Sequence, residues 1–390
     1  MMWRATFQVI SAFAWAYAVI VVVRPLRLGR KWTLLLSAAL ALAFGKFAFF
    51  ALAGGNTFNP NLPQFAIWAY GWIYGTAMLL TAFATVVLVL DGVLRLVRCQ
   101  MTTGAKRFRT AALATAAALT AGWGMYEGVR VPSVKRVEIA YEGLPAAFDG
   151  YRIVHLSDLH CSTAVRRAHI ERIVERVNAL DADLVAMTGD FVDGHVKDRK
   201  DDLAPIAGLR AKDGLLACTG NHEEYWDWKG WCDVLLDFGI VFPELTGPVV
   251  IRRGEDAIVV GGMVDPAFSE KIPPEFACDA ADCFVGTPRS AFRILLCHRP
   301  LTGMIDAAAD NANLRLQLSG HTHGGAMPVL SLLVSLTNEG HVRGLYEFAP
   351  GRYLHVSPGT GQWAGFPLRL FNPCEITEIV LNAADAHNPR

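Results

Sequence analysis

The stretch LRLQLSGHTHGG, residues 314–325, reads as a short buried strand followed by two histidines set between glycines. His321 and His323 stand one residue apart, so on an extended backbone their side chains point to the same side. The flanking glycines permit the tight turn that such an arrangement needs. The stretch therefore predicts a strand whose C-terminal end offers two imidazoles to one centre or to two adjacent centres.

Other stretches in the second half of the chain share this design, an apolar run that ends in Gly, Asp, Asn or His. They are YRIVHLSDLH (151–160), ADLVAMTGD (182–190), GLLACTGNHE (214–223), DAIVVGGMVD (256–265) and FRILLCHRP (292–300). Helix-like segments lie between the first three, near residues 165–180 and 201–211. Strands that alternate with helices predict an α/β domain. Ligand sites in such domains form where strand ends open into loops.

The polar side chains at these strand ends indicate a metal site. They are Asp158, His160, Asp190, Asn221, His222, His298, His321 and His323. For any one of them alone, a hydrogen-bonded loop residue is the simpler interpretation. Together, imidazoles and carboxylates without a thiolate suit Zn, Mn or Fe. The set is too large for one catalytic ion, whereas two ions about 4 Å apart would use it well and would favour phosphoryl displacement.

The motifs together resemble the calcineurin-like metallophosphoesterases, specifically their bacterial membrane-associated branch. The chain has SDLH at 157–160, GD at 189–190, GNHE at 220–223, CHRP at 297–300 and GHTHGG at 320–325, in the order of that family. The resemblance implies an α/β metallophosphoesterase domain made of two packed sheets flanked by helices. It also implies two divalent metal ions as cofactors, and the ligand types leave Mn, Zn and Fe open as their identity.

The resemblance assigns a role to each matching residue. The implied metal ligands are Asp158, His160 and His323 for one ion, Asn221, His298 and His321 for the other, and Asp190 as the bridge between them. His222 would act on the leaving group while a bridging hydroxide attacks phosphorus. Glu223 stands where the branch usually has Asp, and it would orient His222.

Two further residues near these motifs need an interpretation. Arg369 lies in a C-terminal region, GFPLRLFNP, that looks like the same branch, and a guanidinium matches phosphate oxygens, so we predict a substrate contact there. Asp193 lies in GDFVDG, where a partner that orients a ligand of the site is one interpretation and a solvated turn residue is the simpler one.

The first part of the chain has a different composition. Residues 1–130 contain 12 Lys and Arg but only 2 Asp and Glu, whereas the remainder contains 24 and 34. Apolar stretches at 5–23, 32–54, 65–90 and 110–126 are long enough to cross a bilayer. We therefore predict a membrane region of about four transmembrane helices over 1–130 and the metallophosphoesterase domain over 131–390. Lys46, inside the second stretch, is interpreted as packed within the helix bundle.

The positions of the cations predict the orientation of this membrane region. Arg and Lys fill the loops after the first and third stretches, and the loop at 55–64 contains neither. The positive-inside tendency then places the first and third loops in the cytoplasm. With four crossings, a multi-pass protein of the bacterial inner (plasma) membrane would carry its catalytic domain on the periplasmic or exterior side. With three crossings, the orientation reverses.

The expected function is a membrane-anchored, metal-dependent phosphoester hydrolase, most simply a phosphodiesterase. A lipid-linked or amphiphilic phosphoester is one substrate class, because the apolar stretch MPVLSLLVSL (327–336) follows the histidine turn, although a core element is the simpler interpretation of that stretch. Soluble periplasmic nucleotides or sugar phosphates are the alternative substrates, and a non-catalytic membrane sensor is the alternative to an enzyme. The acidic second part argues against a nucleic-acid partner.

The chain has 8 cysteines. Cys278 and Cys283 flank a short acidic loop, and they form either a disulfide in an oxidising compartment or two separate thiols.

Overall fold

The computed structural model describes residues 2–96, 101–266, 279–301 and 313–384. The chain forms two units. The helical unit consists of Met1–Gly128 and the short segment Ala364–Leu368, and the sheet unit consists of Val129–Trp363 and Arg369–Arg390. The sequence predicts a boundary near residue 130, but it does not predict that Ala364–Leu368 returns to the helical unit.

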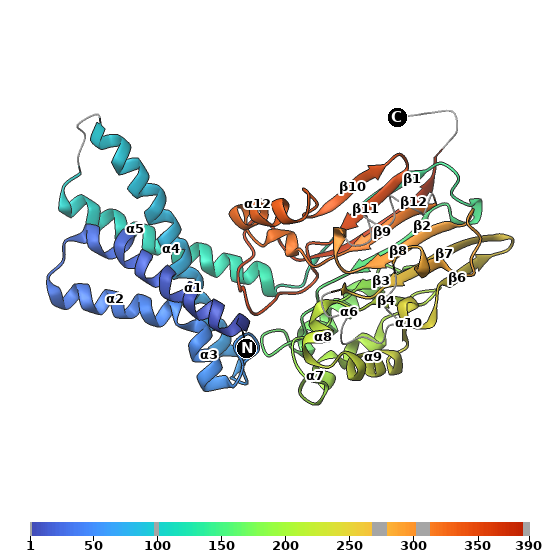
Figure 1. The fold of residues 1–390 in the computed structure, drawn as a ribbon, viewed down its shortest axis with the longest axis horizontal. Helices are drawn as coiled ribbons and strands as arrows, with labels where there is room; N and C mark the ends of the chain where they lie inside the picture. Colours follow the sequence, from blue (N-terminus) through green and yellow to red (C-terminus); the bar gives the residue numbers. More distant parts are fainter. Residues whose placement is uncertain (1, 97–100, 267–278, 302–312, 385–390) are drawn as a thin grey trace. The chain divides into compact units, whose positions relative to one another are not determined.

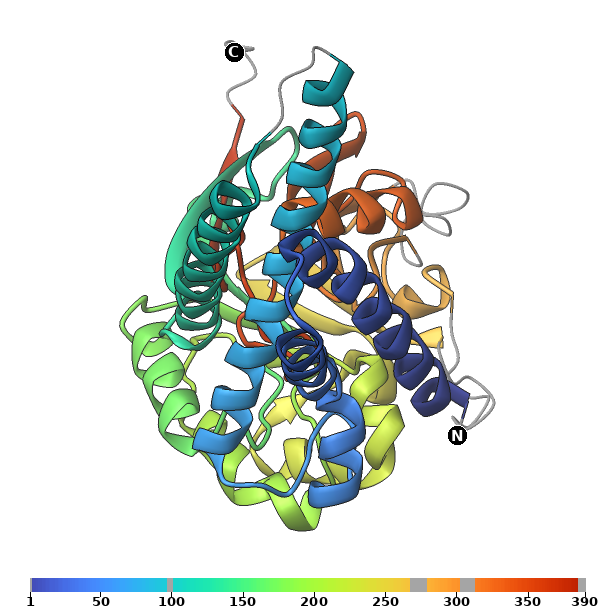
Figure 2. The ribbon, with the colours of Figure 1, turned by 90° about the vertical axis from the view of Figure 1, so that its left-hand side faces the viewer.

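Helices occupy all of the apolar stretches of the first part (Figures 1 and 2). They are α1 (Met2–Ala18), extended by single irregular turns to Leu26, then α2 (Arg30–Phe44), α3 (Lys46–Gly54), α4 (Gln64–Leu96) and α5 (Thr103–Val129). Buried alanines and aromatic rings pack these helices together, with Ala18, Phe44 and Ala77 in one cluster.

Fewer helices than predicted have the length and hydropathy needed to span a membrane. Within the described residues, the helices over Thr6–Leu26 and Gln64–Leu94 are long and apolar enough to cross a membrane. The stretch 32–54 is not one straight span, because α2 and α3 bend by 61° at a break between them. Together they make a third span at most, and α5 does not qualify because its alanines and charged first turns make it less apolar. The prediction of about four spans is therefore reduced to two or three.

The sheet unit contains two six-stranded sheets, which confirms the predicted α/β domain with two sheets. The first has the order β1 (Ser133–Tyr141), β12 (Glu375–Ala383), β2 (Tyr151–Leu156), β3 (Leu184–Thr188), β4 (Leu215–Cys218) and β5 (Ile240–Val241). The second has the order β10 (Gly344–Ala349), β11 (Arg352–Val356), β9 (Leu314–Ser319), β8 (Phe292–Cys297), β7 (Asp256–Met263) and β6 (Val249–Arg253). Strands β2 to β5 are parallel, as are β7, β8, β9 and β11.

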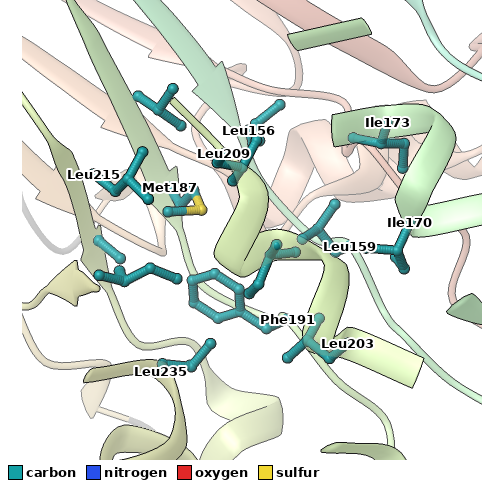
Figure 3. Close-up of a cluster of buried hydrophobic side chains, with 14 of the residues drawn as sticks. Leu156, Leu159, Ile170, Ile173, Met187, Phe191, Leu203, Leu209, Leu215 and Leu235 are labelled. Carbon is teal, nitrogen blue, oxygen red and sulfur yellow. The ribbon is translucent and has the colours of Figure 1, made fainter. Parts of the chain in front are cut away.

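Successive residues of the central strands face two different cores. Leu184 of β3 and Ile294 of β8 lie in a buried cluster that contains side chains of both sheets, so the sheets pack face to face. Val185 and Met187, on the other face of β3, pack against helices (Figure 3). Those helices are α6 (Arg167–Asn178), α7 (Val196–Leu203) and α9 (Trp228–Asp237). This period of two residues explains why these strands read as continuous apolar runs: both faces are buried.

The apolar stretch 327–336 is not a core element. It forms α12 (Pro328–Thr337), and none of the residues of this helix is buried. Val329, Leu332, Leu333 and Leu336 are each between 55% and 75% exposed.

Cys278 lies outside the described residues, so its pairing with Cys283 stays a prediction. The Sγ atom of Cys283 lies 3.2 Å from the carbonyl oxygen of Asp279.

Candidate metal centre

The predicted ligands all lie where strands end. Asp158 and His160 follow β2, Asp190 follows β3, Asn221 opens the short helix α8 (Asn221–Trp226) after β4, His298 follows β8, and His321 and His323 follow β9. Because β2, β3 and β4 are parallel and adjacent, their C-terminal ends share one edge of the first sheet. The ends of β8 and β9 share an edge of the second sheet in the same way.

The backbone at these strand ends is not extended as predicted but left-handed. Asp158, His160, Asp190, His321 and His323 have φ between +46° and +68°. Residues other than glycine adopt this conformation rarely, and such strain persists only where the surrounding structure holds it. Here neighbouring loops hold it, since the backbone N–H groups of Asp158 and His160 donate to the carbonyls of Gly189 and Asp190, each at 3.0 Å. The chain therefore turns sharply at each end and directs these side chains inward.

Asp158, His160 and His323 form the first cluster, with ligand atoms within 4.8 Å of one another. The Nε2 atoms of the two histidines are 3.0 Å apart, and Oδ1 of Asp158 lies 3.5 Å from Nε2 of His323. The other oxygen of Asp158, Oδ2, accepts from Oγ of Ser157 at 2.6 Å and from the backbone of His321 at 3.1 Å. These bonds fix the carboxylate so that Oδ1 faces both imidazoles.

Asp190, His298 and His321 form the second cluster, also within 4.8 Å. Nε2 of His298 lies 3.3 Å from Oδ2 of Asp190 and 3.2 Å from Nδ1 of His321. Nδ1 of His298 donates to the carbonyl oxygen of Thr188 at 2.6 Å, which leaves Nε2 as the nitrogen with a lone pair. Oδ2 of Asp190 is also 3.8 Å from Nε2 of His160, so this oxygen lies between the two clusters.

Two buried oxygens test whether the site fits metal ions. Oδ1 of Asp158 and Oδ1 of Asn221 have no hydrogen-bond partner within the described part of the chain. An unsatisfied buried polar group costs about 1–3 kcal/mol, and more when it is charged. Divalent cations among these oxygens and imidazoles would remove that cost, and the donor set suits Zn, Mn or Fe. The residues therefore fit a divalent metal centre, although they do not choose among these ions.

Asp193 belongs to this centre, so its interpretation as a solvated turn residue is wrong. It is 2% exposed, with Oδ1 2.5 Å from Nδ1 of His222 and Oδ2 3.2 Å from Nδ1 of His160. Burial raises the pKa of its carboxyl, but these two histidines outweigh burial and hold the pKa well below its usual range. In the sequence, the feature that indicates a role in the site is the position of Asp193 three residues after Asp190, in the same strand-end loop. The sequence does not show that this loop is buried.

Glu223 has a different role from the predicted one, because its carboxylate contacts backbone rather than His222. Its Oε1 accepts from the N–H of Phe191 at 2.7 Å, and its Oε2 accepts from Asp190 at 3.0 Å and Gly220 at 2.8 Å. Burial is the main cause that raises the pKa of Glu223 to about 7. Glu223 therefore shapes the loop that carries Asp190, and Asp193 is the residue that orients His222.

His222 lies at the mouth of the centre, with its side chain 13% exposed. Its backbone N–H donates to Oδ1 of Asp190 at 2.8 Å. Burial lowers the pKa of the ring, but Asp190 and Asp193 outweigh it and raise the pKa to about 9. The rings of Tyr225 and Trp363 have centroids 5.1 and 6.1 Å from that of His222, so aromatic side chains border the imidazole.

Arg369, the predicted substrate contact, is fully buried. Its Nε donates to Oε1 of Gln362, its Nη1 to the carbonyls of His323 and Pro358, and its Nη2 to the carbonyl of Gly361 while lying 2.8 Å from Nδ1 of His323. Of the five N–H donors of a guanidinium, these contacts engage four with oxygen acceptors of the protein. Arg369 therefore holds the loop of His323 from inside the protein and is not exposed to a substrate.

Comparison with known proteins agrees with this geometry. The family of calcineurin-like phosphoesterases matches residues 151–325 of the chain. A "Transmembrane protein with metallophosphoesterase domain" from Danio rerio is 34% identical over 68% of this chain and 61% of its own length. A protein of the same name from Bos taurus is 31% identical over 67% of this chain and 60% of its own length. An "Uncharacterized metallophosphoesterase" from Helicobacter pylori is 32% identical over 66% of both chains.

The chain thus spans about three fifths of the length of the two vertebrate relatives. The matched segment begins at the first residue of β2 and ends in the histidine turn after β9, so it includes every strand end that carries a predicted ligand. The chain therefore carries a calcineurin-like phosphoesterase domain and belongs to that family.

Proposed function

We propose that this protein is a membrane-anchored, metal-dependent phosphoester hydrolase with a dinuclear centre. The proposed ligands are Asp158, His160 and His323 for one ion, Asn221, His298 and His321 for the other, and Asp190 for both. One observation supports this assignment above the rest: the two ligand clusters bring together residues from the ends of β2, β3, β8 and β9, and Oδ2 of Asp190 lies 3.3 Å from Nε2 of His298 in one cluster and 3.8 Å from Nε2 of His160 in the other. In this proposal residues 1–130 form the membrane region and residues 131–390 the catalytic domain.

Two bound divalent ions would supply positive charge that polarises the phosphoryl oxygens and lowers the pKa of a bound water. The protein groups contribute position and a proton. Asp193 accepts from Nδ1 of His222. Because Asp190 and Asp193 raise the pKa of this ring to about 9, the imidazole is protonated on both nitrogens near neutral pH, and Nε2 carries a proton that can pass to the leaving-group oxygen. The bond from the backbone of His222 to Asp190 keeps this ring next to the ligands. The partial exposure of His222 lets a substrate reach it.

The first prediction separates catalysis from metal binding. We expect His222→Ala to lower kcat on an aryl phosphodiester by roughly 10²–10⁴-fold, because it removes the proton donor. The variant should still bind Mn²⁺, since none of the proposed ligands changes. Chelation should abolish wild-type turnover, and added Mn²⁺ should restore it. His341→Ala, a histidine outside the centre, is the matched control. Metal binding without any turnover by the wild type would instead favour the membrane sensor.

The second prediction concerns Asp193. Asp193→Asn keeps the size of the side chain but weakens its hold on His160 and His222, so we expect a loss of about 10–100-fold in activity or metal affinity. Asp233→Asn, at an exposed pair with Lys229, is the control and should behave as the wild type. Steady-state kinetics and a Mn²⁺ titration measure both quantities. Wild-type values for Asp193→Asn would remove this residue from the mechanism.

We extend the proposal to a lipid-linked or amphiphilic phosphoester, and α12 is the feature that supports it. The helix begins five residues after His323, and Oγ of Ser331 donates to the carbonyl of Gly324 at 2.6 Å, which ties α12 to the histidine turn. Its ten residues are too few to span a bilayer, which takes about 20. A short helix with exposed Leu and Val side chains suits the boundary between headgroups and acyl chains.

The third prediction tests this surface. Leu332→Ser combined with Leu333→Ser should slow hydrolysis of a long-chain phosphodiester in vesicles several-fold more than that of a soluble aryl phosphodiester. Both residues are exposed, so the fold should tolerate the change. Val285→Ser, an exposed apolar residue in another loop, is the control. Equal effects on both substrates would point to a soluble nucleotide or sugar phosphate.

The predicted side of the membrane depends on whether α5 crosses it. We propose that the catalytic domain faces the periplasm of a bacterial cell. This orientation requires α5 to cross as a fourth span, although α5 is less apolar than the helices that meet the length and hydropathy criteria. A periplasm-dependent reporter such as a phosphatase, fused after Arg390, should then be active, and the same reporter fused after Met101 should be inactive. The reverse pattern would show that α5 stays on one side.

A further inference from the structure

The segment Ala364–Leu368, here named the strap, belongs to the helical unit although the residues on either side of it belong to the sheet unit. The chain enters the strap from Trp363 and leaves it at Arg369. Nε of Arg369 donates to Oε1 of Gln362 at 3.0 Å, which closes the base of this excursion. The strap is therefore a short loop whose two ends are joined by the bond between Arg369 and Gln362 and whose residues pack within the helical unit.

Lys46 is the main polar anchor of the strap. It is the first residue of α3, directly after the bend that separates α2 from α3, and it is 1% exposed. Its Nζ donates to the carbonyl oxygens of Ala364 at 3.1 Å and Gly365 at 3.2 Å. The rings of Phe47, Phe50 and Tyr74 surround the ammonium group at 5.0 to 5.4 Å. A buried ammonium group needs such partners, so Lys46 and the strap carbonyls stabilise one another.

Two glycines of α4 let the other end of the strap approach closely. A Cβ atom at Gly75 would lie 2.9 Å from a methyl group of Leu368, and one at Gly71 would lie 3.3 Å from Cβ of Pro367. Leu368 is fully buried. By contrast, a Cβ at Gly92, in the same helix, would meet nothing within 4 Å. The helical unit thus has a fitted seat for the strap.

The residues that flank the strap reach the proposed metal centre. Arg369 donates to the carbonyl of His323 at 2.8 Å and lies against Nδ1 of the same residue. Trp363 lies beside His222, with ring centroids 6.1 Å apart. A shift of the strap would therefore move Arg369, which contacts the proposed metal ligand His323, and Trp363, which lies beside the proposed proton donor His222.

We infer that Lys46 is a positioning residue for the metal centre: by seating the strap on the helical unit, it fixes Arg369 and, through Arg369, the imidazole of His323. The helical unit is then part of the catalytic machinery and not only an anchor. This inference rests on the proposed function, because it takes His323 as a metal ligand.

The experiment measures Mn²⁺ binding to the full-length, metal-depleted protein in detergent, from the free Mn²⁺ signal in electron paramagnetic resonance. Lys46→Met removes the donors and should raise the apparent Kd at least about tenfold, as loss of a group that orients a ligand does. Lys46→Arg retains N–H donors and should recover most of the affinity. A thermal unfolding curve for each variant, measured in parallel, shows that the protein is folded under the conditions of the Mn²⁺ titration.

Gly75→Ala alters the contact between α4 and Leu368 of the strap without removing a charge. It tests the inference independently if Lys46→Met fails to fold. The added methyl group displaces Leu368, so this variant should also weaken Mn²⁺ binding several-fold, whereas Gly92→Ala should not. Equal affinities for Gly75→Ala and Gly92→Ala would overturn the inference. A wild-type protein that binds no Mn²⁺ and hydrolyses no ester would instead reject the proposed function.

Discussion

The carboxylate of Asp190 is the group on which the arrangement of the site depends. It is nearly inaccessible to water, its Oδ1 accepts from the backbone of His222, and its Oδ2 faces imidazoles from both sheets. A buried carboxylate is costly unless charge and hydrogen bonds compensate it. Hydrogen-bond donors from separate strand ends supply this compensation. Oδ1 of Asp158 and Oδ1 of Asn221 still lack a hydrogen-bond partner within the described residues, and bound cations would satisfy them. The fold can bring these donors together because parallel strands end at a common edge.

Two carboxylates near Asp190 hold different parts of the centre in place. Glu223 accepts backbone N–H groups of Asp190 and Phe191, and so it sets the course of the loop. Asp193 instead contacts two side chains, with one oxygen on His222 and the other on His160. A single carboxylate thereby orients both a proposed metal ligand and the proposed proton donor, which couples their positions. The left-handed backbone at the strand ends is the strain that this network holds in place.

The helical unit and the sheet unit are connected more than once along the chain. Beyond the junction near residue 130, the strap takes the chain from Trp363 into the helical unit and back to Arg369. The relatives from Danio rerio and Bos taurus are named transmembrane proteins, and two helices here are long and apolar enough to span a bilayer. An exposed apolar helix, α12, follows the histidine turn. In our proposal, a hydrolase with these features takes its substrate from the membrane surface and depends on its helices for the geometry of its metal ligands.

From the sequence alone, the motifs predicted the family and, through it, the two-sheet α/β class. The polar residues that end each short apolar run also indicated a site at the strand ends, because a buried strand rarely contains such residues, and the structure brings them together there. It also located the helices of the first part. Burial and partners were decided only by the tertiary structure: Asp193, Glu223 and Arg369 all took roles different from those expected. The sequence does not show whether water or buried backbone surrounds the side chains of Asp193, Glu223 and Arg369, and that difference decides their roles. For the same reason, only the folded chain connects Lys46 to the strap, since their contact joins residues more than 300 positions apart.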